Sequence, residues 1–273
     1  MKIGNREFKN GVHTYVMGIL NVTPDSFSDG GNYNSVEKAR EHARQMILEG
    51  ADIIDVGGES TRPGYTMIRE EEEIARVVPV IEMLANEFDT VISIDTYKSK
   101  VAKAALKAGA HLVNDIWGLK YDADMARVIS EADASVCIMH NRKEMDYSDF
   151  PKDWLNDIGE SLQIARNAGI PDEKIMIDPG VGFAKTYEMN LYCIRELKKL
   201  HKFGLPILLG TSRKSVIGLT LDLPKNEREE GTIATTVLAV KAGCDFVRVH
   251  NVAGNVRAIK MVEAIRDVKE VWT

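Results

Sequence analysis

Short runs of β-branched residues alternate with longer stretches of mixed hydrophobic and polar residues from about residue 15 to the end of the chain. Short apolar runs of this kind predict buried strands, and the longer amphipathic stretches predict helices. We expect strands near residues 15–20, 52–56, 91–95, 112–116, 135–140, 174–178, 206–211 and 246–250. Regular alternation of strand and helix is typical of βα units on a parallel sheet.

Glycine separates several expected helices from the next strand, where it supplies the left-handed conformation that ends a helix. These glycines are Gly50, Gly109, Gly169 and Gly243. No linker or low-complexity tract divides the repeats. A closed barrel pairs every strand, whereas an open doubly wound sheet should show a break or a glycine-rich nucleotide turn. We therefore predict an α/β fold, a single (β/α)8 TIM barrel over residues 15–273, with a short N-terminal extension or hairpin over residues 1–14.

Composition narrows the class of protein. The 273 residues include 35 Lys and Arg against 41 Asp and Glu, a formal charge of −6, which argues against a nucleic-acid or anionic-membrane surface. No apolar run approaches the roughly 18 residues needed to cross a bilayer, and the first ten residues lack the apolar block of a signal peptide. Three isolated cysteines indicate small core residues in a reducing compartment, so we expect a cytoplasmic protein.

Polar side chains follow the apolar part of nearly every expected strand. They are Asn21, Asp55, Asp95, Asn114, Asp115, His140, Asp178, Thr211, Ser212 and His250. Any one of them is explained equally well as a capping or turn residue. Together they indicate a shared site, because the carboxyl ends of barrel strands form the active-site face of this fold.

Two cationic side chains are expected to point the same way from the last strand. Residues two apart on a strand share a face, which directs Arg248 and His250 together toward the mouth of the barrel. The segment 210–215 adds Arg213, Lys214 and hydroxyl donors beside them. Loops after the last two strands are the usual phosphate site of such barrels, so we predict a substrate that carries phosphate or diphosphate. For Arg213 and Lys214 alone, a solvated loop is the alternative.

Two acids are expected to point inward from other strands. Alternation directs Asp95 and Asp178 into the barrel, where a carboxylate is costly unless it is paired or hydrogen-bonded. A carboxylate accepts two parallel hydrogen bonds, so these acids are suited to the N–H donors of a planar heterocycle. The alternative is an internal ion pair with Lys214 or Arg248. Two long, glycine-marked loops, at 21–31 and 57–64, suggest lids, with ordinary surface turns as the alternative.

These segments together resemble the dihydropteroate synthases, a pterin-binding enzyme family, in the family's order from about residue 15 to 265. Each motif is moderately specific, and the ordered set is far more so. The matching segments are Gly18–Gly30, Gly57–Gly64, Ser93–Thr96, Val113–Asp115, Asp178–Phe183, Gly210–Ser215 and Arg248–His250.

The resemblance implies an activity. The family joins 6-hydroxymethyl-7,8-dihydropterin diphosphate to 4-aminobenzoate, giving 7,8-dihydropteroate and diphosphate in folate biosynthesis. It further implies Mg²⁺ as cofactor and a homodimer. An aromatic amine attacks as the neutral base, which agrees with the lack of an obvious nucleophile and base set in the sequence.

The resemblance also implies residue roles, with Asp95, Lys214, Arg248 and His250 as the catalytic groups. The pterin would be held by Asp95, Asn114, Asp178 and Lys214, with Met139 against its ring. The diphosphate would be held by Asn21, Arg248 and His250, and Asn21 would also contact Mg²⁺. The lids would include Phe27, Ser28, Asp29, Thr61, Arg62 and Pro63. The aminobenzoate pocket would be shaped by Phe27, Pro63, Phe183 and Ser215.

Three other functions fit parts of the pattern. A corrinoid-linked methyltransferase that binds a reduced folate would need the Asp95, Asn114 and Asp178 set but not the diphosphate clamp. A sugar-phosphate aldolase or isomerase would be expected to carry a Schiff-base lysine on a strand end, yet the sixth expected strand ends in Asp178 and Lys214 lies in a loop. A non-enzymatic pterin-binding protein would bind ligand without releasing diphosphate.

Overall fold

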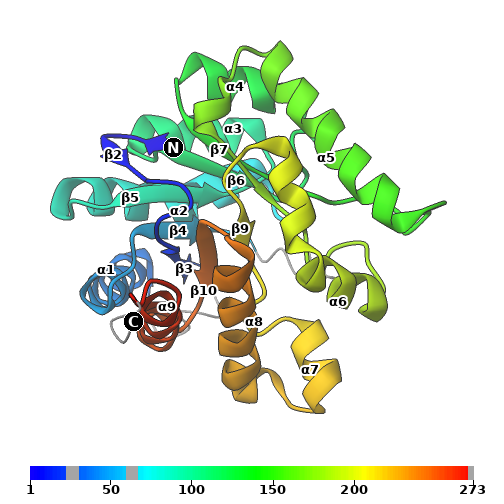
Figure 1. Ribbon diagram of the computed structural model, residues 1–273. Helices are drawn as coiled ribbons and strands as arrows, with labels where there is room; N and C mark the ends of the chain where they lie inside the picture. Colours follow the sequence, from blue (N-terminus) through cyan, green and yellow to red (C-terminus); the bar gives the residue numbers. More distant parts are fainter. Residues whose placement is uncertain (23–30, 60–66, 270–273) are drawn as a thin grey trace.

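Eight parallel strands form a nearly closed barrel surrounded by helices in the computed structural model, which describes residues 1–22, 31–59 and 67–269 (Figure 1). The strands are β3 (Tyr15–Asn21), β4 (Ile53–Gly57), β5 (Val91–Asp95), β6 (Leu112–Asp115), β7 (Ser135–Met139), β8 (Ile175–Asp178), β9 (Leu208–Leu209) and β10 (Phe246–Val249). Their order is β8-β7-β6-β5-β4-β3-β10-β9. A parallel bridge between Ile177 and Ile207 brings β8 to the segment before β9. The predicted α/β barrel is confirmed.

The helices follow the strands as the sequence pattern predicts. They are α1 (Gly31–Glu49), α2 (Glu70–Glu87), α3 (Ser99–Ala108), α4 (Met125–Glu131), α5 (Phe150–Asn167), α6 (Tyr187–Arg195), α7 (Ser215–Leu221), α8 (Glu229–Ala242) and α9 (Val252–Arg266). Short 3-10 turns cover Asp172–Lys174, Leu197–Phe203 and Lys225–Glu227. Gly109 ends α3 with a φ of 117° while its N–H bonds the carbonyls of Ala105 and Leu106, as expected for a left-handed helix end.

The predicted alternation of side chains along the strands is confirmed. Ile94 and Ile177 belong to the large apolar cluster between barrel and helices, whereas Met176 packs inside the barrel. One strand is shorter than predicted: β9 covers two residues instead of the expected 206–211. Pro206 lacks an N–H, and the N–H of Ile207 donates to the Asp245 carboxylate at 3.1 Å instead of to a neighbouring strand.

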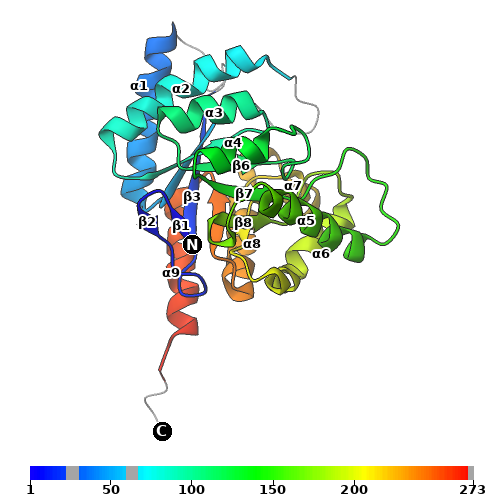
Figure 2. The ribbon, with the colours of Figure 1, turned by 90° about the horizontal axis from the view of Figure 1, so that it is seen from above.

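A two-stranded antiparallel hairpin lies at the amino-terminal end of the barrel. Its strands are β1 (Lys2–Ile3) and β2 (Arg6–Glu7), and Figure 2 shows it beside β3. Ile3 and Phe8 are fully buried and pack inside the barrel against Met176 and Phe246. The hairpin therefore covers the end of the barrel opposite to the carboxyl ends of the strands. The division of the chain into residues 1–14 and 15–273 stays a prediction.

The three cysteines behave as the sequence indicated. Cys137, Cys193 and Cys244 are buried and form no disulfide. Within the described ranges, no helix combines the length and the apolar character that crossing a bilayer requires.

We expect Phe8→Ala to destabilise the protein by about 3–5 kcal/mol, because it removes a fully buried aromatic ring and leaves a cavity. Urea unfolding followed by circular dichroism measures the change. The control is Val12→Ala, since Val12 is 59% exposed and should alter stability by no more than about 0.5 kcal/mol. Equal stability of the two variants would mean that the hairpin does not seal the barrel.

Candidate functional site

Arg248 forms a buried ion cluster with two acids at the carboxyl ends of the strands. Its Nε donates to Asp55 Oδ2 and its Nη2 donates to Asp95 Oδ2, both at 2.6 Å. The Asn114 amide also donates to Asp55 Oδ2, at 3.2 Å. Of the two interpretations of Asp95 that the sequence left open, the internal ion pair with Arg248 is present in this structure.

The cluster keeps unused acceptors. Oδ1 of Asp55, Oδ1 of Asp95 and Oγ of Ser93 are buried and have no hydrogen-bond partner within the described part of the chain. Leaving a buried polar atom unpaired costs about 1–3 kcal/mol, so such atoms in a native structure call for a missing partner. Acceptors of this kind match a ligand that brings N–H donors.

Electrostatics differ across the cluster. Burial raises the pKa of Asp95 to about 7, and the positive charge of Arg248 opposes that rise. Burial alone would lower the pKa of Arg248, but Asp55 and Asp95 raise it above its ordinary value. The guanidinium therefore stays charged, and Asp95 can gain or lose a proton near neutral pH.

A second group of charges meets beside Arg248. A Cβ placed on Gly210 would lie 3.4 Å from Asp178 Oδ2, 3.8 Å from Lys214 Nζ and 3.9 Å from the Cβ of Arg248. Asp178, Lys214 and Arg248 therefore surround one point next to a residue without a side chain. Acids from the middle strands and cations from the last two βα units do lie together at one end of the barrel.

Lys214 and Asp178 are held by the loop after β8. Lys214 Nζ donates to the Val181 carbonyl at 2.6 Å and lies 4.8 Å from the centroid of the Phe183 ring. Asp178 Oδ1 accepts the Gly180 N–H at 2.7 Å. Burial lowers the pKa of Lys214 to about 8, against the influence of Asp178.

An apolar surface borders these charges. Met139 is buried in a small cluster with Tyr97 and Ile116, against which Trp117 and Phe183 pack. Met139 ends β7, next to β8 and Asp178. Apolar side chains beside unpaired acceptors suit a flat, largely apolar ring with polar edges.

One predicted anion residue, His250, is hydrogen-bonded to the segment that follows β9. His250 follows β10, and its Nδ1 lies 2.9 Å from Ser212 Oγ, which also accepts the His250 N–H. Arg213 lies 3.7 Å from Glu229, so it pairs with α8. Ser215 is exposed at the first residue of α7.

One of the polar residues at the strand ends is a turn residue, the alternative that the sequence left open. Asp115 accepts the N–H groups of Trp117 and Leu119, each at 2.8 Å, and so closes a turn.

The predicted lid residues belong to two segments that the structure does not describe. Phe27, Ser28, Asp29, Thr61, Arg62 and Pro63 lie outside the described residues.

Two charged groups near the site were missed in the sequence. Asp55 was noted only as a polar strand end, although it shares Arg248 with Asp95. Lys98 is buried and donates to Glu59 and Glu73, each at 2.7 Å. For Asp55, its position at a strand end was the feature of the sequence that could have indicated a role in the site. For Lys98 and Glu73 there was no such feature, because they lie far apart in sequence and belong to no motif.

The donor set at the mouth allows a magnesium ion that arrives with phosphate oxygens. Among the described residues, no group of three His, Cys, Asp or Glu side chains is placed to hold a metal. Asn21 ends β3, and a Cβ on Gly57 would lie 3.5 Å from its Oδ1 and 3.9 Å from Asp95 Oδ2. Mg²⁺ usually takes one or two protein oxygens and completes its shell with substrate phosphates and water, so Asn21 fits this use.

Comparison with known proteins agrees with this geometry. The family model of the pterin binding enzymes matches residues 17–250. The chain is 57% identical over 266 residues to the dihydropteroate synthase of Clostridium beijerinckii, covering 97% of this chain and 99% of that protein.

Solved structures show the same likeness. A dihydropteroate synthase from Clostridium difficile, crystallised in the presence of pteroic acid, superposes with a TM-score of 0.92 at 53% identity, covering 95% of this chain and 99% of that one. A dihydropteroate synthase from Xanthomonas albilineans with 4-aminobenzoic acid gives a TM-score of 0.90 at 39% identity, covering 95% of each chain.

We expect Arg248→Met to destabilise the protein by about 3–5 kcal/mol at pH 8, because it leaves buried carboxylates without their cation. The folded-state pKa of Asp95 already lies above its unfolded value. An ionised Asp95 therefore weakens folding above the unfolded pKa, and the penalty shrinks as the pH falls through the folded pKa. Urea unfolding at pH 6 and at pH 8 measures the free energy of unfolding. Arg248→Met should lose less of it at pH 6 than at pH 8.

The control for this variant is Arg257→Met on α9, where the side chain is exposed. It should change stability little and equally at the two pH values. A loss for Arg248→Met that is the same at pH 6 and pH 8 would show that Asp95 does not take up a proton between these values.

Proposed function

The chain belongs to the pterin-binding enzyme family and is a dihydropteroate synthase, and from that premise we propose that the ion cluster of Asp55, Asp95 and Arg248 forms the floor of its pterin site. The enzyme condenses 6-hydroxymethyl-7,8-dihydropterin diphosphate with 4-aminobenzoate to give 7,8-dihydropteroate and diphosphate. The observation that carries the proposal is the unpaired Oδ1 of Asp95, buried beside a charged arginine.

The pterin edge supplies what the site lacks. Asp95 and Asp178 accept N–H groups of the pterin ring. The amide of Asn114 adds a polar contact that fixes which edge of the ring faces the acids. Lys214, seated on the loop after β8, donates to a ring acceptor. Met139 packs against the ring face. Buried polar groups left unpaired without the correct ligand discriminate strongly against analogues that lack its donors.

The leaving group lies toward the last two βα units. Asp55 and Asp95 engage Nε and Nη2 of Arg248, and we assign Nη1 to the departing diphosphate oxygens together with His250. Asn21 contributes an oxygen ligand to Mg²⁺. When bound, Mg²⁺ supplies a Lewis acid that balances negative charge on the diphosphate.

The reaction is a dissociative substitution at the pterin methylene. Breaking the carbon–oxygen bond builds positive charge on the methylene and negative charge on the leaving oxygens. Asp95 stabilises the cationic pterin, while Arg248 and His250 stabilise the oxygens, because preorganised groups in a dry site count for more than in water. The neutral amine of 4-aminobenzoate then attacks without a dedicated base.

We assign Phe183 and Ser215 to the aminobenzoate pocket. The other residues assigned to this pocket or to its lids, Phe27, Ser28, Asp29, Thr61, Arg62 and Pro63, lie outside the described residues. Exclusion of water from the pocket would protect the cation from capture.

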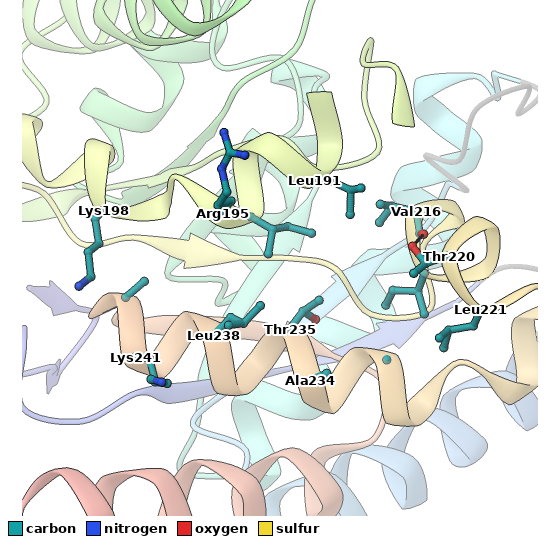
Figure 3. Close-up of a pocket in the computed structure, with 14 residues that line it drawn as sticks. Leu191, Arg195, Lys198, Val216, Thr220, Leu221, Ala234, Thr235, Leu238 and Lys241 are labelled. Carbon is teal, nitrogen blue, oxygen red and sulfur yellow. Dashed lines mark hydrogen bonds between the residues drawn. The ribbon is translucent and has the colours of Figure 1, made fainter. Parts of the chain in front are cut away.

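The subunits pair through the apolar face of α6, α7 and α8. Four leucines on this face are between 39% and 68% exposed: Leu191, Leu219, Leu221 and Leu238. Leu191, Leu221 and Leu238 line a cavity of about 520 Å³ (Figure 3), and Leu219 belongs to α7, which contributes to the same face. Because carboxylates and unpaired acceptors are missing from its described lining, a second copy suits this face better than a pterin does.

Two further points complete the proposal. Residues 1–14 form an extension that closes the barrel, and residues 15–273 form the pterin-binding domain. The free, buried cysteines support a cytoplasmic location, where thiols stay reduced.

The test of the proposed site is product formation from the pterin diphosphate, 4-aminobenzoate and Mg²⁺, with each component omitted in turn. We expect dihydropteroate and diphosphate in equal amounts, and none when any component is absent. Lys214→Met should lower kcat/KM by about 10²–10³, the usual effect of losing one preorganised donor. Lys174→Met, which removes a lysine before β8 at the opposite end of the barrel, should not.

Product formation at the wild-type rate by Lys214→Met would move the pterin site elsewhere. Binding of the pterin diphosphate without diphosphate release would support the non-enzymatic alternative.

We expect Leu238→Glu to separate the homodimer into monomers, because a buried carboxylate at an apolar contact is costly unless paired. Sedimentation velocity measures the mass. The control is Met261→Glu on α9, an apolar residue that is 61% exposed and does not line this cavity. A monomeric wild type, or a variant that remains dimeric, would contradict the assignment of the interface.

A further inference from the structure

The ammonium of Lys185 lies at the centre of the loop that follows β8. Its Nζ donates to the Gly180 carbonyl at 2.8 Å, to the Phe183 carbonyl at 3.0 Å and to His140 Nδ1 at 2.7 Å. An ammonium has three N–H donors, so each is used. Residues 180–185 are thereby folded around their own lysine and tied to the end of β7.

The histidine partner is in a defined tautomer. Because Lys185 donates to Nδ1 of His140, that nitrogen must be the acceptor, and Nε2 carries the proton. Nε2 then donates to Asp157 Oδ2 at 2.9 Å. Burial lowers the pKa of His140 to about 4, which keeps the ring neutral and able to accept.

Arg142 ends this chain of contacts. It donates to both carboxylate oxygens of Asp157, from Nε at 2.6 Å and from Nη2 at 3.0 Å. Although burial opposes it, the hydrogen bonds from His140 and Arg142 hold the pKa of Asp157 well below its usual range. A charged arginine, a charged aspartate and a neutral histidine thus align in front of Lys185.

The loop after β8 packs closely against the end of β7. Gly180 has a φ of 73°, and a Cβ there would lie 1.8 Å from the His140 carbonyl oxygen. The N–H of His140 also donates to the Asp178 carbonyl at 3.0 Å. The loop after β8 is therefore seated on the end of β7.

The same loop holds Lys214. The Val181 carbonyl accepts from Lys214 Nζ, and the Phe183 ring lies below it. These two residues lie inside the segment that Lys185 closes, one on each side of Gly182. A change at Lys185 thus reaches Lys214 through two contacts without touching the ligand.

We propose that Lys185, oriented by His140, is a positioning residue that sets the location of the Lys214 ammonium and the Phe183 ring for binding of the pterin and the amine. The proposal rests on the proposed function of Lys214. Lys185 lies two residues after the matching segment Asp178–Phe183, and the resemblance implied no role for it.

The test is a double-mutant cycle that uses pteroic acid as probe and calorimetry to measure its Kd. Lys185→Met should weaken binding by about tenfold, within the range of coupling measured between residues that act through a shared contact. In the Lys214→Met background the same change should cost clearly less than in the wild type, because the part of its effect that acts through Lys214 is already lost and only the part through Phe183 remains. Lys152→Met, at an exposed position on α5, controls for loss of a lysine.

Histidine variants test the orientation by His140. His140→Asn keeps an oxygen that accepts from Lys185, whereas His140→Leu does not. We expect Asn to retain more affinity for pteroic acid than Leu, at equal Tm. Equal affinities of these two variants, or full additivity of Lys185→Met with Lys214→Met, would overturn the proposal. A lower Tm with unchanged Kd in Lys185→Met would reduce Lys185 to a stabilising residue.

A spectroscopic measurement separates this inference from the proposed function. The ¹⁵N resonance of His140 Nδ1 should be that of an unprotonated acceptor and should shift in Lys185→Met but not in Lys152→Met. This shift depends only on the contact. If wild-type protein failed to form dihydropteroate, the proposed site would fail while the shift remained; a resonance unchanged in Lys185→Met would overturn the inference alone.

Discussion

One arginine shared by two buried carboxylates is the constraint on which the site depends. Asp55 and Asp95 come from the neighbouring strands β4 and β5, and Arg248 reaches both from β10. Charges of this kind are costly to remove from water unless they are paired. The barrel makes the pairing possible, because parallel strands bring all three side chains to one end while apolar residues fill the rest of its interior.

The two ends of the barrel divide the work between stability and chemistry. At the amino-terminal end, Phe8 and Ile3 complete an apolar core inside the barrel. At the carboxyl end, the site keeps unpaired acceptors and two lysines whose pKa burial lowers, Lys185 and Lys214. These groups cost folding free energy. A well-packed core beneath the site makes that cost tolerable.

Much of this arrangement follows from periodic features of the sequence. The strands, the inward direction of Asp95 and Asp178, and the glycines that end helices each obey a local rule, so the fold and the convergence of the site could be predicted. The partners of the charges could not. Whether Arg248 meets a substrate phosphate or the acids of β4 and β5 depends on distances between strands far apart in sequence. The contacts of Lys185 depend in the same way on how one loop folds on another.

The shared arginine also limits how this protein can change over evolutionary time. A guanidinium offers donors on separate nitrogens in a fixed plane, and no other side chain can serve two carboxylates in that way. A lysine can bridge two carboxylates, as Lys98 does for Glu59 and Glu73, but only from one nitrogen. Replacement of Arg248 by lysine would therefore lose one of the two separate donor positions that Asp55 and Asp95 use, and replacement of either acid would leave a donor of Arg248 unpaired. Positions 55, 95 and 248 are therefore expected to change together in evolution. A different set of side chains at this cluster would require compensating substitutions on three strands.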